Sequence, residues 1–142
     1  DELMMISTRG RYALRVLIDL AEHQNGKYIP MKEVAARQDI SLSYIERILP
    51  VLTKAKLIEG LHGKGGGYQL TKSPEQYKVG DILRLTEGDL APVACVGCDA
   101  KECNRMDHCR TVSMWDRFYA MTNEYFDGIT LADLMRPQLD LE

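Results

Sequence analysis

The stretch LIEGLHGKGGGYQL, residues 57–70, decides the fold. Apolar and polar side chains alternate over residues 57–61, and residues 68–70 form a short return segment, as in two paired strands. Four glycines stand between them, within residues 62–67. Such a run indicates a backbone with unusual dihedral angles or one that closely approaches another surface. The stretch therefore predicts a β-hairpin with a glycine-rich tip.

Three helical segments precede this hairpin. Apolar residues recur at steps of three and four over residues 8–24, a short helix is expected over residues 31–38, and a third helix follows. Ser41 or Ser43 can cap the third helix, and Ser43 with Glu46 fits a capping box. Pro50 predicts a kink or a helical restart. Three short helices followed by a glycine-tipped hairpin is the order of a winged helix-turn-helix.

The second half of the chain adds helices but no further strand pair. Short helices are expected over residues 74–78 and 79–87, and a long helix over residues 110–126 with a short terminal helix after it. The long helix has apolar residues on more than one side, which predicts burial against a second copy as a homodimer. The predicted fold class is mainly α with a small β-hairpin wing, a winged helix-turn-helix plus a long C-terminal dimerisation helix.

This order predicts three functional parts. They are a winged-helix DNA-binding domain over residues 5–87, a cysteine-rich segment over 88–109, and the dimerisation helix with the terminal helix over 110–136. Residues 1–4 and 137–142 are expected to be tails, in part derived from a cloning vector.

Composition and charge fit a protein that binds a polyanion. The chain has 142 residues, of which 45% are hydrophobic and 27% charged, so disorder is excluded. No run is long enough to span a membrane and no signal peptide opens the chain, so a cytoplasmic location is expected. Residues 1–73 hold 11 Lys and Arg against 8 Asp and Glu, whereas residues 74–142 hold 7 against 13. A basic half beside an acidic half suggests one face made for double-stranded DNA.

The candidate DNA contacts lie in three places. Polar residues of the third helix can enter a major groove, where Arg reads guanine and Glu accepts from cytosine. The wing can follow the backbone or the minor groove, and basic residues at the start of the first helix can hold phosphates. The candidates are Arg9, Arg11, Ser41, Ser43, Tyr44, Glu46, Arg47, His62, Lys64, Gly65 and Gly66.

The sequence contains no catalytic motif. It lacks a nucleophile elbow, a zinc-protease motif and a P-loop. The chain is therefore predicted not to be an enzyme, and a winged-helix adaptor that binds protein is the alternative to a DNA-binding regulator.

The four cysteines lie close together, at Cys95, Cys98, Cys103 and Cys109, with the spacing C-x2-C-x4-C-x5-C. In an intracellular protein such a group is more often a metal site than a disulfide framework. Thiolates bind iron–sulfur clusters and zinc, and free thiols can act as redox switches. The spacing leaves these three possibilities open.

Several collinear motifs resemble the IscR-like winged-helix transcription regulators of the Rrf superfamily, over about residues 5–136. They are ISTRGRYAL at 6–14, SLSYIE at 41–46, GKGGGY at 63–68, VGDI at 79–82 and ITLADL at 129–134. The resemblance implies a homodimeric bacterial regulator of a palindromic operator, with Ser43 and Glu46 as base readers. Arg47 and His62 stand where the family commonly has Gln and Arg, so the operator is expected to differ.

The resemblance also implies a [2Fe–2S] cluster, with Cys98, Cys103 and Cys109 as ligands. Val112 stands where the family has a ligating histidine, and Cys95 can replace it. His108, Asp107 or a residue of the partner subunit are the other candidates for the fourth ligand. The predicted function is a regulator, typically a repressor, whose operator binding is controlled by this cluster in response to iron, redox state or nitric oxide. A zinc-stabilised or thiol-based regulator, for example of cysteine metabolism, is the alternative.

Overall fold

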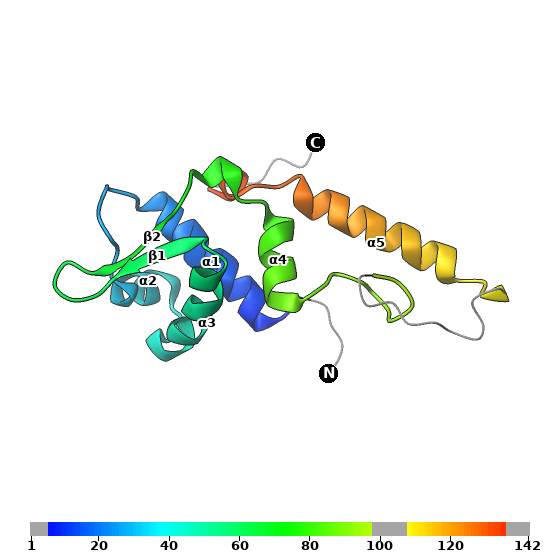
Figure 1. Cartoon of the computed structure of the whole chain (residues 1–142), viewed down its shortest axis with the longest axis horizontal. Coiled ribbons are helices and arrows are strands. Elements are labelled where there is room, and N and C mark those ends of the chain that lie inside the picture. The colour runs from blue at the N-terminus through cyan, green and yellow to red at the C-terminus, as the bar shows by residue number, and fades with distance from the viewer. Residues whose placement is uncertain (1–5, 98–107, 136–142) are drawn as a thin grey trace.

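The computed structural model describes residues 6–97 and 108–135 and is mainly helical with a small hairpin, as predicted (Figure 1). The predictions for the tails, Cys98, Cys103 and Asp107 lie largely or wholly outside the described residues. The elements are α1 (Thr8–Glu22), α2 (Met31–Gln38), α3 (Leu42–Lys54), β1 (Ile58–Leu61), β2 (Gly67–Leu70), the 3-10 turn η1 (Pro74–Gln76), α4 (Val79–Glu87), α5 (Val112–Asp127) and α6 (Leu131–Leu134).

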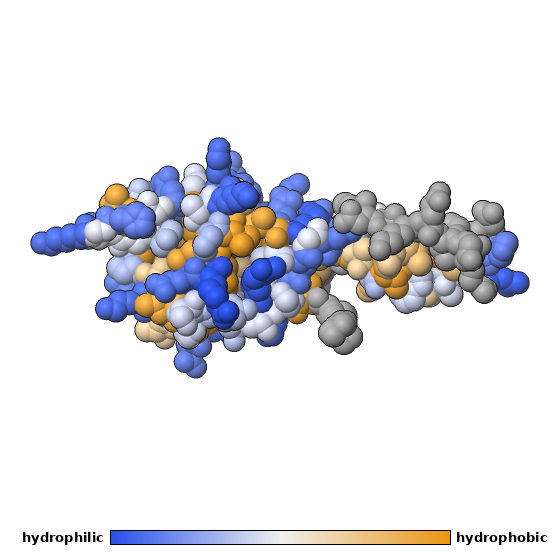
Figure 2. Space-filling model, turned by 60° about the horizontal axis from the view of Figure 1, so that its bottom comes forward, coloured by the Kyte–Doolittle hydropathy of each residue, from blue (hydrophilic) through white to orange (hydrophobic). Residues whose placement is uncertain are grey.

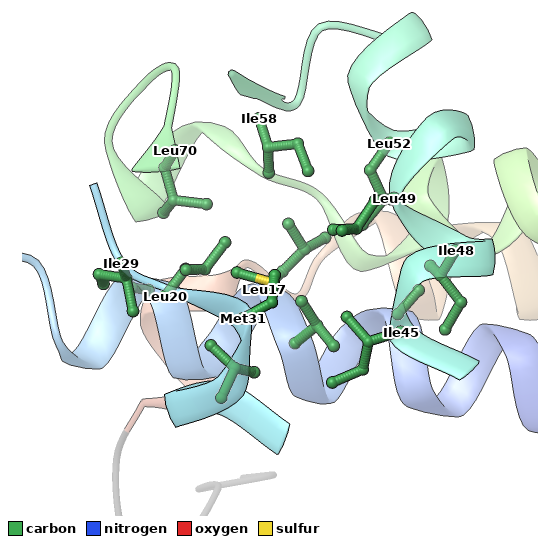
Figure 3. Packing of buried hydrophobic residues seen from close by; sticks show 14 of the residues in the cluster. Leu17, Leu20, Ile29, Met31, Ile45, Ile48, Leu49, Leu52, Ile58 and Leu70 are labelled. Carbon is green, nitrogen blue, oxygen red and sulfur yellow. The ribbon is translucent and has the colours of Figure 1, made fainter. Parts of the chain in front are cut away.

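The hydrophobic core lies between α1, α3 and the base of the hairpin (Figure 3). Leu17 and Leu20 of α1 face the apolar side of α3, and Ile58 and Leu70 close the core from the two strands. The helical residues recur at the three- and four-residue steps of an amphipathic helix, so one face of each helix is buried. Leu131 of α6 is fully buried in the same cluster, so the described end of the chain packs back onto the first helices.

The start of α3 differs from the predicted capping box. Ser41 is the N-cap, and its hydroxyl accepts a hydrogen bond from the Tyr44 backbone N–H at 3.2 Å. Ser43 is the second residue of the helix instead, so of the two predicted caps Ser41 is the one confirmed. The preceding turn decides this: Asp39 takes a left-handed conformation with a φ of 55°, and Ile40 is buried. The helix is therefore capped at Ser41, two residues earlier than the Ser43–Glu46 pattern requires.

Pro50 neither ends nor restarts α3, because the helix is continuous from Leu42 to Lys54. Pro50 removes the N–H that would bond the carbonyl of Glu46. Both residues are exposed, so water can reach that carbonyl. The buried apolar side chains on the inner face of α3 stabilise the helix on both sides of Pro50. The prediction of a restart is therefore wrong.

Two parts of the molecule can be distinguished (Figure 1). The body comprises residues 6–87 and 129–135, and the arm comprises residues 88–97 and 108–128. The arm is built on α5, which extends away from the body. Arg84 of α4 connects the two parts, since its guanidinium donates to the Asn123 side chain at 2.7 Å and also to Asp127. The hydrogen bond to Asp127 raises the pKa of Arg84, against the opposing effect of burial.

Candidate nucleic-acid interface and cysteine segment

The wing is an antiparallel hairpin in which Ile58 pairs with Leu70 and Leu61 pairs with Gly67. Its tip depends on glycine, because Gly63 and Gly65 have φ angles of 89° and 78°, in the left-handed region. This confirms the unusual backbone predicted from the glycine run. His62 and Lys64 are exposed at the tip, beside Gly65, and Gly66 is half-buried. The four predicted wing contacts therefore share one turn, in which the Gly66 N–H donates to the Gly63 carbonyl at 3.0 Å.

The base of the wing is fixed by a buried tyrosine that the sequence analysis did not single out. The Tyr77 hydroxyl donates to the Leu57 carbonyl at 2.6 Å and accepts from the Thr71 N–H at 3.0 Å. Tyr77 is 1% exposed. Its two partners stand just before β1 and just after β2, so one hydroxyl joins both ends of the hairpin.

The outward side of α3 carries the predicted recognition residues. Ser43, Glu46 and Arg47 are exposed, and Tyr44 is half-buried. The Arg47 guanidinium lies 5.0 Å from the centre of the Tyr44 ring, in a cation–π contact. Ser41 is exposed as well, although its hydroxyl is already the helix cap.

A second tyrosine–arginine pair lies on α1 and contacts the first. The rings of Tyr12 and Tyr44 meet edge to face at 5.3 Å, and Arg15 lies 5.2 Å from the centre of the Tyr12 ring. The Arg15 Nε–H also donates to the Gln38 side chain at 3.2 Å. Tyr12 is one of the residues at the three- and four-residue steps over residues 8–24, and Arg15 is not among the predicted DNA contacts. The repeated Tyr-x-x-Arg spacing in α1 and α3 is the signal that could have found this pair.

A buried ion pair holds α2 against α1. Asp19 is 0% exposed, and its carboxylate accepts from Arg37 Nη2 at 2.7 Å and from Arg37 Nε at 3.1 Å. Gln38 Nε2 donates to the same carboxylate at 2.9 Å. The hydrogen bond to Asp19 raises the pKa of Arg37, so the guanidinium stays charged. The pair fixes the first two helices, and through Gln38 it supports Arg15.

Arg9 and Arg11 are exposed at the start of α1, as their predicted role requires. Arg9 also donates to the Thr86 carbonyl at 2.8 Å, and Arg11 donates to the Thr8 hydroxyl at 3.1 Å. Arg9 thus lies beside the end of α4. Glu87, in the last position of α4, accepts from the Ser7 hydroxyl at 2.6 Å at the same junction.

Two of the four cysteines are among the described residues. Cys95 and Cys109 are both half-buried, and Cys95 is a free thiol. The Cys109 sulfur lies 3.5 Å from the Thr111 hydroxyl, at the start of α5. Within residues 6–97 and 108–135, no three His, Cys, Asp or Glu side chains gather as a metal site. His108 is exposed. The cysteine sulfurs fit the donor chemistry of a cluster or of zinc.

The arm has an exposed apolar face. Met114, Phe118, Met121 and Tyr125 are between 49% and 53% exposed. They follow one another at steps of four, three and four residues, which places them along one side of α5. Apolar side chains also show on the surface of the arm in Figure 2. None of the residues of α5 is buried.

The sequence pattern of the Rrf2 family, described as an iron-dependent transcriptional regulator, matches residues 6–137. The chain belongs to the Rrf2 family. This confirms the resemblance drawn from the motifs in α1, α3 and the wing. Rrf2 regulators are non-enzymatic DNA-binding proteins, so the prediction that the chain is not an enzyme is confirmed as well.

The sequence of this Rrf2 regulator is similar to those of known relatives over nearly its whole length. It is 38% identical to Protein rrf2 of Nitratidesulfovibrio vulgaris, covering 94% of this chain and 88% of that one. It is 32% identical to the HTH-type transcriptional regulator IscR of Aliivibrio salmonicida, covering 93% and 77%.

Two solved structures share its winged-helix fold. CymR, the global cysteine regulator of B. subtilis, matches with a TM-score of 0.75 and 31% identity, covering 94% of this chain and 97% of that one. IscR of T. potens matches with a TM-score of 0.72 and 32% identity, covering 93% and 86%. These matches confirm the predicted fold class. Among the described helices of the Rrf2 regulator, none combines the length and apolar character that crossing a membrane requires.

Proposed function

We propose that this Rrf2 regulator is a homodimer whose binding to a palindromic operator is controlled by an iron–sulfur cluster held by Cys95, Cys98, Cys103 and Cys109. The observation that carries the proposal is the place of the cysteines. They lie between α4, the last helix before them in the body, and α5, the helix of the arm. The similarity to proteins named IscR and the iron-dependent description of the family support it.

The proposed operator contacts are the exposed side chains of α3, the wing and the start of α1. Ser43 and Glu46 would read bases, while Arg47 would read a base or hold a phosphate. Lys64, His62 and the backbone at Gly65 and Gly66 would follow the groove beside α3, and Ser41 and Tyr44 would add phosphate contacts. Arg9 and Arg11 would hold phosphates at the start of α1.

The proposed dimer forms through residues 110–126. The steps of four, three and four between the exposed apolar residues of α5 are those of a coiled-coil seam, in which two helices pack side by side. A two-fold axis through that seam would place two α3 helices at a fixed spacing, as a palindromic operator demands.

The cysteines connect these two parts. Cys95 follows the end of α4 and Cys109 precedes the start of α5, so a ligand set that includes both fixes the path of the chain between the two helices. When bound, the cluster, proposed as [2Fe–2S], supplies a centre sensitive to iron and oxidants. The four thiolates would hold it, and their release would loosen the connection between body and arm. The spacing of the two α3 helices would change with it.

A cluster-free regulator is the second candidate function, in which the thiols respond to oxidation or bind zinc. The specific observation in its favour is the similarity to CymR, which is described as a global cysteine regulator. The half-buried cysteine side chains at Cys95 and Cys109 suit this function too.

A metal and sulfide assay separates the two candidates. The protein is purified without oxygen, its visible spectrum is recorded, and iron, sulfide and zinc are measured on the same sample. Visible charge-transfer bands with matching iron and sulfide support the cluster, whereas a colourless protein with stoichiometric zinc, or with no metal, supports the second candidate. Operator affinity is then compared before and after exposure to air. Equal affinities in a cluster-loaded protein would contradict control by the cluster.

A further inference from the structure

The segment that leads to the first cysteine is tied to α5 by one carboxylate. Gly88 ends α4 with a φ of 87°, and Asp89 follows it. The Asp89 Oδ1 atom accepts from the Leu90 N–H at 2.8 Å and from the Tyr119 hydroxyl at 2.8 Å. Tyr119 lies in the middle of α5 and is half-buried. The chain is therefore bonded to α5 as soon as it leaves the body.

The same carboxylate also lies close to the other end of the segment, at Gly97. Gly97 lies so near Asp89 that a Cβ atom on Gly97 would be 2.4 Å from the Asp89 Oδ2 atom and 2.7 Å from the Ala91 Cβ. Leu90 and Val96, next to the two ends of the loop, are 8% and 5% exposed. Cys95 precedes Val96, so it lies in a loop whose first end is bonded to α5 and whose two ends lie close together.

We infer that Tyr119 and Asp89 are positioning residues that present the Cys95 thiol, relative to α5, for metal binding. The inference rests on the proposed function and refines it, because Cys95 is the ligand that replaces the missing histidine at Val112. A ligand held in place before the metal arrives binds more tightly, since less conformational freedom is lost on binding.

The thiol of Cys109, the second described cysteine, lies at the start of the same helix. The Cys109 sulfur lies 3.5 Å from the hydroxyl of Thr111, which is the N-cap of α5. The arm therefore fixes Cys109 directly and Cys95 through Tyr119. A change at Tyr119 should move the first thiol and leave the second in place.

The first test uses the reduced, metal-free protein. Tyr119→Phe keeps the ring and removes the hydroxyl, and alkylation of each cysteine by iodoacetamide is followed by mass spectrometry. We expect the rate at Cys95 to rise about five-fold, as the loss of one hydrogen bond allows, with the rate at Cys109 unchanged. Tyr28→Phe, in the loop between α1 and α2, is the matched control and should change neither rate. Equal Cys95 rates in the wild type and in Tyr119→Phe would overturn the inference.

The second test uses the protein reconstituted with iron and sulfide. Release of iron to a chelator is measured for the wild type, Tyr119→Phe, Cys95→Ser and the double variant. We expect Tyr119→Phe to speed release several-fold in the wild type and to have no effect in the Cys95→Ser background. Independent effects of the two substitutions would contradict action through Cys95. A wild type that takes up no iron would refute the proposed function, whereas the alkylation rates would still decide the role of Tyr119.

Discussion

The body and the arm of the molecule differ in how they bury apolar side chains. In the body, residues such as Leu17, Ile45 and Leu52 are 0% exposed, and they belong to one continuous core. In the arm, α5 has no buried residue, and its largest apolar side chains are about half exposed. The body can therefore be stable within one chain, whereas the arm presents an apolar surface that the proposed dimer would cover.

Their ion pairs differ in the same direction. In the body, Arg37 binds a carboxylate of Asp19 that is 0% exposed. Between body and arm, Arg84 of α4 binds the carboxylate of Asp127, whose side chain is 36% exposed. Water competes for the second pair and not for the first carboxylate, so the first contributes more to holding its helices together. The ion pair between body and arm is thus the more exposed of the two.

Phe118→Glu should have the largest effect, and it should act on the arm alone. Each copy would lose an apolar contact and place a charge in the proposed seam, so the dimer should lose about 4–6 kcal/mol over its two copies. Sedimentation or light scattering should find monomers, and operator affinity should fall with them. The melting of the body should be retained.

Ala120→Glu is the control for that experiment. It adds the same charge to the same exposed helix, two residues later and therefore about 200° around it. It should leave the dimer intact. A Phe118→Glu protein that stays dimeric would show that the copies meet elsewhere.

Arg37→Met tests the body. It leaves the Asp19 carboxylate buried with Gln38 as its remaining donor at hydrogen-bond distance, at a cost of about 3 kcal/mol in the free energy of unfolding. Urea unfolding followed by circular dichroism measures this loss. Glu33→Gln removes the other carboxylate near Arg37, at 3.6 Å and 58% exposed, and should change stability by less than about 0.5 kcal/mol. Equal losses in the two variants would contradict the importance of burial.

The body was also the part most accessible from sequence. The apolar steps predict α2 with the bounds it has in the structure, Met31–Gln38, and the glycine run predicts the wing tip. Local patterns failed where tertiary packing decides. Ser43 fits a capping box in isolation, but burial of Ile40 sets the start of α3, and core packing carries that helix through Pro50.

The candidate site divides in the same way. Exposure of Ser43, Glu46 and Lys64 follows from helical and hairpin geometry, so the sequence could place them on the surface. The contact of Tyr12 with Tyr44 joins two helices across the core, and the hydroxyl of Tyr77 joins the ends of the wing. The repeated Tyr-x-x-Arg spacing is the only trace of the first contact in the sequence, and the second contact leaves no periodic trace. The arrangement of the cysteines is not described for all four, so it stays a prediction.

Tyr77→Phe should destabilise the body less than Arg37→Met does. It tests whether the position of the wing affects DNA binding in a protein that still folds. The loss of the hydroxyl leaves the Leu57 carbonyl and the Thr71 N–H without this partner, which should cost about 1–2 kcal/mol of stability. Operator affinity should fall by about ten-fold because the wing is less firmly held, while the dimer is unchanged. Tyr125→Phe removes a hydroxyl from the arm and should leave the stability of the body unaltered. Wild-type affinity in Tyr77→Phe would show that wing placement does not depend on this hydroxyl.

Lys64→Gln should have the smallest effect and the most specific one. Lys64 is exposed at the wing tip, so its removal should leave stability and dimerisation as they are. A phosphate contact releases counterions when it forms, so the slope of log affinity against log salt should become shallower by about 0.9 for each copy, or about 2 for a dimer on its operator. Lys78→Gln, an equal charge change at the N-cap of α4, is the control. If both variants shift the slope alike, general charge attracts the DNA, and the wing has no particular phosphate to hold. If only Lys64→Gln shifts it, the wing tip contacts the DNA backbone through this side chain.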